Sequence, residues 1–74
     1  MIKVTIQLNK HSDNEEYCSP TLLVTEDNSD DKCPIILPEY METVDAILLT
    51  DKLKTSIEDN YKSVAEVEKA IYGG

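Results

Sequence analysis

The 74-residue sequence contains no arginine and no glycine before its last two residues. Without an internal glycine it cannot form the glycine-rich loop that cradles phosphates in nucleotide-binding proteins. No apolar run approaches the ~20 residues of a membrane-spanning helix. The first residues alternate between apolar and polar and do not resemble a signal peptide. We therefore expect a cytoplasmic protein with no membrane contact, located in the host cytoplasm if it is viral.

Histidine and cysteine are also scarce, which argues against metal and catalytic sites. His11, Cys18 and Cys33 lack the closely spaced ligand pair of zinc sites. Nothing in the sequence aligns His11 with either thiol as the base of a nucleophilic mechanism. Two cysteines without a secretion signal indicate reduced thiols. We expect no catalytic residue, no metal and no cofactor, and hence a protein that is not an enzyme.

The charge is strongly acidic and unevenly distributed. The net charge is −8, from 15 acidic residues and seven lysines. The segment 11–31 contains seven of the acids and no lysine: Asp13, Glu15, Glu16, Glu26, Asp27, Asp30 and Asp31. A surface of this kind repels nucleic acid and anionic membranes and attracts basic partners or cations.

The length and composition fit one small domain over residues 1–74. Hydrophobic residues make up 41% of the chain and charged residues 30%, which is ordinary for a globular protein. A domain of this size buries only about 60% of its unfolded surface, so we expect a stability of a few kcal/mol.

The first half of the chain predicts three strands. Residues 1–9 show strict alternation, which gives a strand with one apolar face: Ile2, Val4, Ile6 and Leu8. A polar turn over 10–16 and a loop over 27–32 then bound a second strand over 17–26, and a third covers 33–37. Proline cannot donate to a sheet ladder, so we expect Pro20 at an edge or before the strand proper, and Pro34 on an edge strand.

The second half predicts helices. Pro38 suits the first turn of a helix, and Glu39 and Glu42 suit its positive end. One apolar face follows, consisting of Tyr40, Val44, Ile47 and Leu48. A second series, Leu49, Leu53 and Ile57, is rotated from it and predicts a bend near Thr50 and Asp51. Residues 44–49 are also compatible with a buried strand, although the helix is the preferred interpretation.

The last ten residues predict a short amphipathic helix. Ser63 and Glu66 have the spacing of a capping box, and Gly73 stands where a helix commonly ends. The order is therefore β-β-β-α-α. We expect an α+β fold: a small three-stranded antiparallel sheet with two or three helical segments packed on one face.

The acidic loop at residues 27–31 does not have the pattern of a calcium site. An EF-hand loop that began at Asp27 would place Lys32 at its glycine position and Pro38 at its bidentate glutamate position. A loop that began at Asp13 would place Val24 at that last position. A solvated turn is the simpler interpretation.

Binding of another protein is the remaining function class. Sharply stated, the protein is a viral or mobile-element inhibitor whose carboxylates imitate nucleic-acid phosphates on a basic, nucleic-acid-handling host protein. The contact set would be the seven acids of segment 11–31. In a meander the two acidic loops lie at opposite ends of the sheet, so this idea needs further carboxylates between them, such as Glu39, Glu42, Glu58 and Asp59. An accessory subunit without a charge-based role, which contacts others through an apolar helix face, is an alternative. In either case we expect a monomer or a small homo-oligomer.

A third possibility depends on a resemblance. The chain resembles the ubiquitin-like β-grasp sulfur carriers at Met1-Ile2-Lys3-Val4, at Thr43-Val44-Asp45-Ala46 and at Gly73-Gly74. That resemblance implies a β-grasp fold and an activated carboxylate at Gly74. It also implies a strand before the glycine tail, where this sequence predicts a capped helix.

Overall fold

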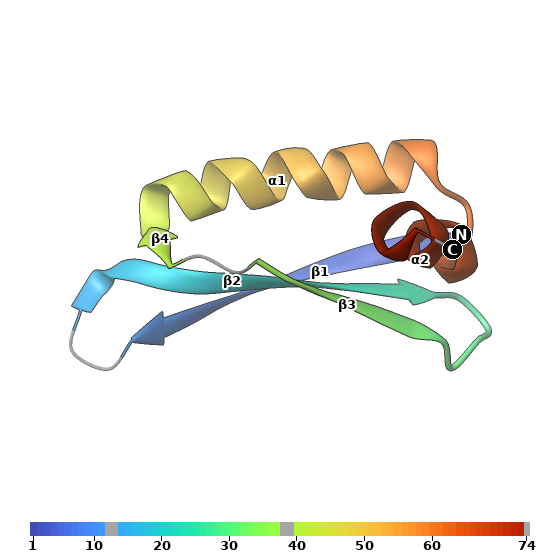
Figure 1. Ribbon diagram of the computed structural model, residues 1–74, viewed down its shortest axis with the longest axis horizontal. Coiled ribbons are helices and arrows are strands. Elements are labelled where there is room, and N and C mark those ends of the chain that lie inside the picture. The colour runs from blue at the N-terminus through green and yellow to red at the C-terminus, as the bar shows by residue number, and fades with distance from the viewer. Residues whose placement is uncertain (12–13, 38–39, 74) are drawn as a thin grey trace.

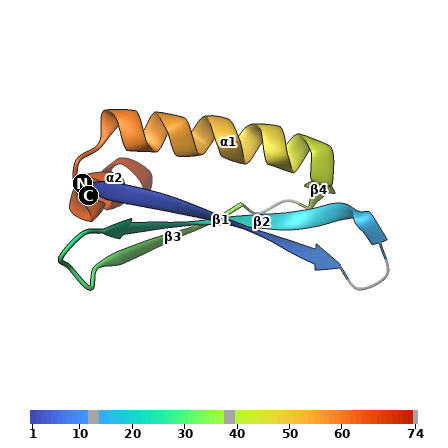
Figure 2. The same ribbon diagram turned by 180° about the vertical axis from the view of Figure 1, so that it is seen from behind.

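The computed structural model describes residues 1–11, 14–37 and 40–73. Its elements are β1 (Ile2–His11), β2 (Asn14–Glu26), β3 (Lys32–Ile36), β4 (Met41–Glu42), α1 (Thr43–Asn60) and α2 (Val64–Tyr72). The strands form an antiparallel sheet in the order β1-β2-β3, and the two-residue β4 pairs with the start of β2. Both helices lie on the same face of this sheet (Figures 1 and 2). The predicted α+β class and the β-β-β-α-α order are confirmed.

The first hairpin is longer than its polar sequence predicts. The expected turn over residues 10–16 is wrong, because β1 continues to His11 and β2 begins at Asn14. The register is regular from Ile2 opposite Glu26 to Lys10 opposite Cys18, and it shifts between Lys10 and His11. Cross-strand pairing therefore extends the sheet through residues whose own preference is for turns.

Pro20 lies within the middle strand, which corrects the expectation of an edge position or a place before the strand. It is fully buried and stands opposite Leu8 of β1. Its carbonyl accepts a 3.3 Å hydrogen bond from the N–H of Leu37, just past the end of β3. The nitrogen of Pro20 faces the same side, where the neighbouring strand has ended. The missing N–H therefore costs no ladder hydrogen bond.

The core lies between the sheet and the two helices. The alternating face of β1 is turned inward, with Ile2 and Val4 buried and Ile6 packed against them. Leu22 and Val24 of β2 and Cys33 of β3 complete the sheet side, and Ile57, Val64 and Val67 supply the helix side. The alternation predicted from the sequence of β1 is confirmed.

Helix α1 differs from its prediction in its start, its straightness and its buried face. Residues 44–49 are helical, as preferred, but the helix begins at Thr43 and is continuous to Asn60, without the expected bend. Pro38 and Glu39 lie outside the described residues, and Tyr40 precedes the helix. The buried residues are Ala46, Thr50 and Ile57, with Leu53 half-buried between them. The face predicted from Val44, Ile47 and Leu48 points outward instead.

Small side chains explain this rotation. Ala46 and Thr50 carry little bulk, so α1 can lie close to the sheet at its first half. The Thr50 hydroxyl donates to the carbonyl oxygen of Ala46 at 2.6 Å, which satisfies the one buried polar side chain of this face. Burial of a hydroxyl without such a partner would be costly.

Helix α2 has the caps predicted for it. The Ser63 hydroxyl accepts a 3.2 Å hydrogen bond from the N–H of Glu66, and the Glu66 carboxylate accepts one of 3.0 Å from the N–H of Lys62. Gly73 ends the helix in the left-handed conformation, with φ of 67°. Its N–H donates to the carbonyl of Lys69, as in an αL cap.

Each outer edge of the sheet has one position capped by a side chain from a helix, and the β3 edge also carries a proline. On β1 the outward N–H of Val4 donates to the Glu58 carboxylate of α1 at 2.9 Å. On β3 Pro34 has no N–H, and its carbonyl accepts a 3.1 Å hydrogen bond from the Tyr72 hydroxyl of α2. Capped edges and edge prolines prevent a sheet from pairing with further strands.

Candidate functional site

The structure places the described members of the seven predicted contact acids toward the two ends of a molecule 38 Å long. Glu16 lies near the start of β2, at the end of the first hairpin. Asp27, Asp30 and Asp31 lie in the loop after β2, at the opposite end (Figure 1). Asp13 lies outside the described residues, and so does the side chain of Glu15. The expectation of two separate acidic ends is therefore met.

Glu26 has a structural contact. Its carboxylate accepts a 2.8 Å hydrogen bond from the N–H of Val64, the first residue of α2. A carboxylate at this place also favours the positive end of the helix dipole. Glu26 therefore anchors α2 to the end of β2, while Asp27, Asp30 and Asp31 beyond it are exposed.

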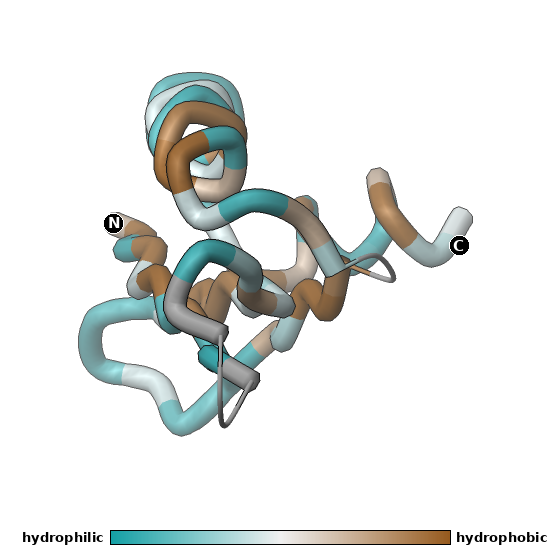
Figure 3. The backbone as a smooth tube through the Cα atoms, turned by 90° about the vertical axis from the view of Figure 1, so that its left-hand side faces the viewer, coloured by the Kyte–Doolittle hydropathy of each residue, from teal (hydrophilic) through white to brown (hydrophobic). Residues whose placement is uncertain are grey.

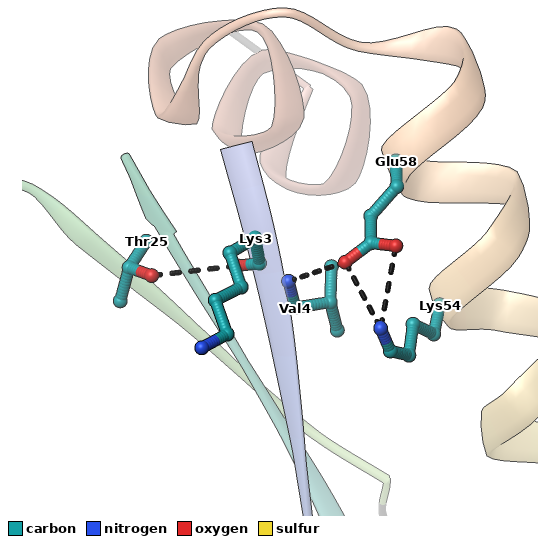
Figure 4. A network of polar contacts seen from close by, with 5 residues as sticks. All are labelled: Lys3, Val4, Thr25, Lys54 and Glu58. Atoms are coloured by element: carbon teal, nitrogen blue, oxygen red, sulfur yellow. Dashed lines mark hydrogen bonds and ion pairs between the residues drawn. The ribbon is translucent and has the colours of Figure 1, made fainter. Parts of the chain in front are cut away.

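Glu58 is a second structural carboxylate, and no sequence pattern predicts its role. It accepts the hydrogen bond from Val4 and forms an ion pair with Lys54 at 3.2 Å (Figure 4). The hydrogen bond from the Val4 N–H, followed by that from Lys54, lowers the pKa of the Glu58 carboxyl. Glu58 is therefore not one of the helix carboxylates that could extend a charged contact surface.

The first half of α1 exposes large apolar side chains. Val44 is 67% exposed, Ile47 52% and Leu48 59%. They stand at positions i, i+3 and i+4 and therefore share one face of the helix. Figure 3 views the molecule from this end and shows the first turns of α1, partly hydrophobic, nearest the viewer. A cluster of this kind on a small protein indicates an interaction surface.

Acidic side chains border this cluster. Glu16 and Glu42 line the same shallow depression as Val44 and Thr43. Asp45 and Asp51 on α1 are exposed as well. We define the acidic–apolar surface by five residues: Glu16, Glu42, Val44, Ile47 and Leu48. It contains Glu16 from the seven predicted contact acids, Glu42 from the helix carboxylates expected to extend them, and three apolar residues that were predicted to form one helix face.

A separate apolar groove lies on the other side of α1. Its volume is about 280 Å³, and it is lined by α1 through Leu53, by α2 through Ile71 and by the sheet through Leu22 and Leu37. Helix α2 has nine residues and lies over one end of β3, and it forms one wall of this groove. Its lining carries no charged side chain, so it offers nothing that would select a partner by charge.

The two cysteines are free and buried, as expected. Cys33 pairs with Val24, and Cys18 lies six residues before Val24 in β2. At ~3.3 Å per residue, this places the two cysteines about 20 Å apart. Burial, and secondarily the charge of Glu68, raises the pKa of the Cys33 thiol. The Cys33 thiol is thus held in its less reactive, protonated form.

Within residues 1–11, 14–37 and 40–73, no three histidine, cysteine or acidic side chains are grouped as metal ligands would be. In the same part of the chain, neither helix combines the length and the apolar character needed to cross a membrane.

Comparisons with protein-family models, with curated proteins and with solved structures found no match to this chain.

Proposed function

We propose that the protein is a non-enzymatic binding module that holds a basic protein partner against its acidic–apolar surface. The observation that carries this proposal is the outward position of Val44, Ile47 and Leu48 beside Glu16 and Glu42. Apolar side chains supply binding energy when they are covered, and the bordering charges select the partner.

The charge of the whole chain supports a basic partner. At a net charge of −8 without any arginine, the protein attracts positive surfaces over long range and repels a second copy of itself. A surface that normally binds nucleic acid is positively charged, so proteins of that class fit the requirement. In its sharpest form the proposal is an inhibitor from a virus or mobile element that takes the place of nucleic acid on such a protein.

Binding of the partner at one acidic end of the molecule can be distinguished from binding at the other by substitution. If the acidic–apolar surface binds, Ile47 and Leu48 contribute together with Glu16 and Glu42. If simple phosphate mimicry by the second loop is responsible, Asp30 and Asp31 contribute and the apolar residues do not. Two substitutions at each end remove the same amount of charge, which provides a matched comparison.

The test is capture followed by titration. The immobilised protein is incubated with a lysate of the cells in which it is naturally made, and the captured protein is purified and titrated by calorimetry. We expect Ile47→Ser with Leu48→Ser to weaken binding more than ten-fold, and Glu16→Gln with Glu42→Gln to weaken it about three- to ten-fold. Asp30→Asn with Asp31→Asn should change it less than two-fold. Added salt should weaken binding, and duplex DNA should compete if the partner handles nucleic acid.

Opposite outcomes refute the proposal. An effect confined to Asp30 and Asp31 would move the contact to the second loop. An affinity that does not depend on salt would exclude a charge-selected partner. If only the apolar substitutions weaken binding, and salt has no effect, the protein is better described as an accessory subunit without a charge-based role.

The structure offers no observation in favour of the carrier alternative. The β-grasp resemblance requires a strand before the glycine tail, and the chain forms helix α2 there. The cap of helix α2, in which Gly73 adopts the left-handed conformation, explains a glycine at this position without a carrier role.

A further inference from the structure

A stacked aromatic pair, with one ring exposed and one half-buried, lies at the same end of the molecule as the acidic–apolar surface. The rings of Tyr17 and Tyr40 stack with centroids 5.7 Å apart and planes inclined by 27°. Tyr17 belongs to β2, and Tyr40 directly precedes β4, the short strand that pairs with it. About half of the Tyr40 side chain, 52%, is exposed. Its ring can therefore be reached from solvent while it stacks on Tyr17.

A carboxylate stands directly beside this pair. Glu42 is the cross-strand partner of Tyr17, and directly opposite residues on one face have Cβ atoms about 4.5–5.5 Å apart. Glu42 is also two residues from Tyr40, which places both on the same side of an extended segment. Lys10 pairs with Cys18, the residue that follows Tyr17 in β2. Because successive strand residues point to opposite faces of a sheet, Lys10 lies on the face opposite to Tyr17.

This combination of groups has a defined ligand chemistry. A guanidinium group is planar, stacks on aromatic rings and donates paired hydrogen bonds to a carboxylate. A lysine ammonium is a compact, strongly hydrated charge and gains less from a flat ring. The chain itself contains no arginine, so a guanidinium at this place must come from another molecule.

We propose that the Tyr17–Tyr40 pair and Glu42 form a recognition site for an arginine side chain of the basic partner. The guanidinium stacks on the ring of Tyr40 and donates hydrogen bonds to the Glu42 carboxylate. This inference rests on the proposed function for its biological setting, and it adds that the protein selects arginine over lysine. It also assigns a binding role to Tyr17 and Tyr40, which are not among the seven predicted contact acids.

The experiment compares two short peptides on the whole protein. Hexaarginine and hexalysine carry the same formal charge, so a purely electrostatic surface binds them about equally. Titration is followed by the NMR signals of the tyrosine rings and by calorimetry. We expect hexaarginine to bind more tightly and to shift the ring signals of Tyr17 and Tyr40 preferentially. Tyr40→Leu should weaken hexaarginine binding about two- to five-fold and leave hexalysine binding unchanged.

Two further variants control for charge and for folding. Tyr40→Phe keeps an aromatic face and should retain the preference for arginine. Tyr72→Leu removes another exposed tyrosine, at the far end of the molecule, and should not affect either peptide. Thermal unfolding of each variant confirms that the fold is intact.

The inference is overturned if the wild-type protein binds the two peptides equally, or if Tyr40→Leu and Tyr72→Leu have the same effect. Either result leaves the capture experiment on Ile47 and Leu48 untouched, so the proposed function can stand when this site fails. Conversely, a preference for arginine that is lost in Tyr40→Leu supports the site even if no partner depends on the apolar residues.

Discussion

Replacement of Glu58 by alanine should destabilise the protein more than replacement of an exposed acid without such a backbone contact. The substitution removes the 2.9 Å hydrogen bond to the Val4 N–H and the ion pair with Lys54. A hydrogen bond to a charged group contributes about 1.5–3 kcal/mol, and an i,i+4 ion pair about 0.3–0.5 kcal/mol. The Glu58 side chain is 30% exposed, so water can partly replace both partners. We therefore expect the free energy of unfolding to fall by about 2 kcal/mol.

Urea unfolding at pH 7, followed by circular dichroism, measures this loss. Glu58→Gln keeps an oxygen acceptor for Val4 and loses only the charge, so it should cost less than about half as much. Asp59→Ala removes the adjacent exposed acid and should change stability by less than about 0.5 kcal/mol. Equal effects of Glu58→Ala and Asp59→Ala would refute the edge-cap explanation.

The pH dependence of the same variants gives an independent check. The pKa of Glu58 is lowered in the folded protein, first by the Val4 hydrogen bond and then by Lys54. A carboxyl with a lowered folded pKa stabilises the fold fully above its unfolded pKa, about 4.3 for glutamate. That contribution is lost as pH falls through the lower folded value. The difference in stability between wild type and Glu58→Ala should thus be constant above about pH 5 and shrink below pH 4.

Three other predictions concern stability and reactivity. Ile47→Ser with Leu48→Ser should lower the free energy of unfolding, measured by urea, by less than about 1 kcal/mol, because both side chains are mostly exposed. A loss of several kcal/mol would mean that they are core residues. Ser63→Ala should cost about 1 kcal/mol through loss of the α2 cap, and an unchanged urea midpoint would show that the cap contributes nothing. Cys18 and Cys33 are buried and should react with a thiol reagent only when the protein unfolds. Rapid labelling of the native protein, detected by absorbance, would contradict their burial.

Local signals predicted the parts of the fold that local interactions determine. The alternation in β1 and the caps of α2 involve neighbours in sequence, so residues such as Ser63 and Gly73 identify them directly. The separation of the acidic loops followed from meander topology alone. The turn at 10–16 failed because a long ladder overrides the turn preference of polar residues.

Hydrophobic periodicity found the buried face of α1 only in the second half of the helix, where Leu53 and Ile57 of the second predicted series face the core. Val44, Ile47 and Leu48 are more apolar than Ala46 and Thr50, yet the smaller residues face the sheet. The criterion that would have found them is size, since close approach of a helix to a sheet requires little side-chain volume. An apolar helix face was expected to bind only in the accessory-subunit alternative, and the sequence did not indicate that Val44, Ile47 and Leu48 are the residues exposed for it.

The roles of Glu26 and Glu58 were equally inaccessible to sequence reasoning. Each carboxylate accepts a backbone N–H far away in the chain, with separations of 38 residues for Glu26 and 54 for Glu58. No spacing rule connects such partners before the fold is known. In an acidic chain these two structural carboxylates looked the same as those available for binding.

The way in which the sheet edges are closed links solubility to helix docking. Glu58 and Tyr72 reach the edges only while α1 and α2 are packed on the sheet. A partly unfolded state in which α2 has detached would uncover the β3 carbonyl and much of the apolar groove at once. Variants that loosen the helices, such as those at Ser63 or Glu58, should therefore aggregate from partly folded states before they unfold completely. Like-charge repulsion between chains opposes this aggregation, so it should become visible first in concentrated salt.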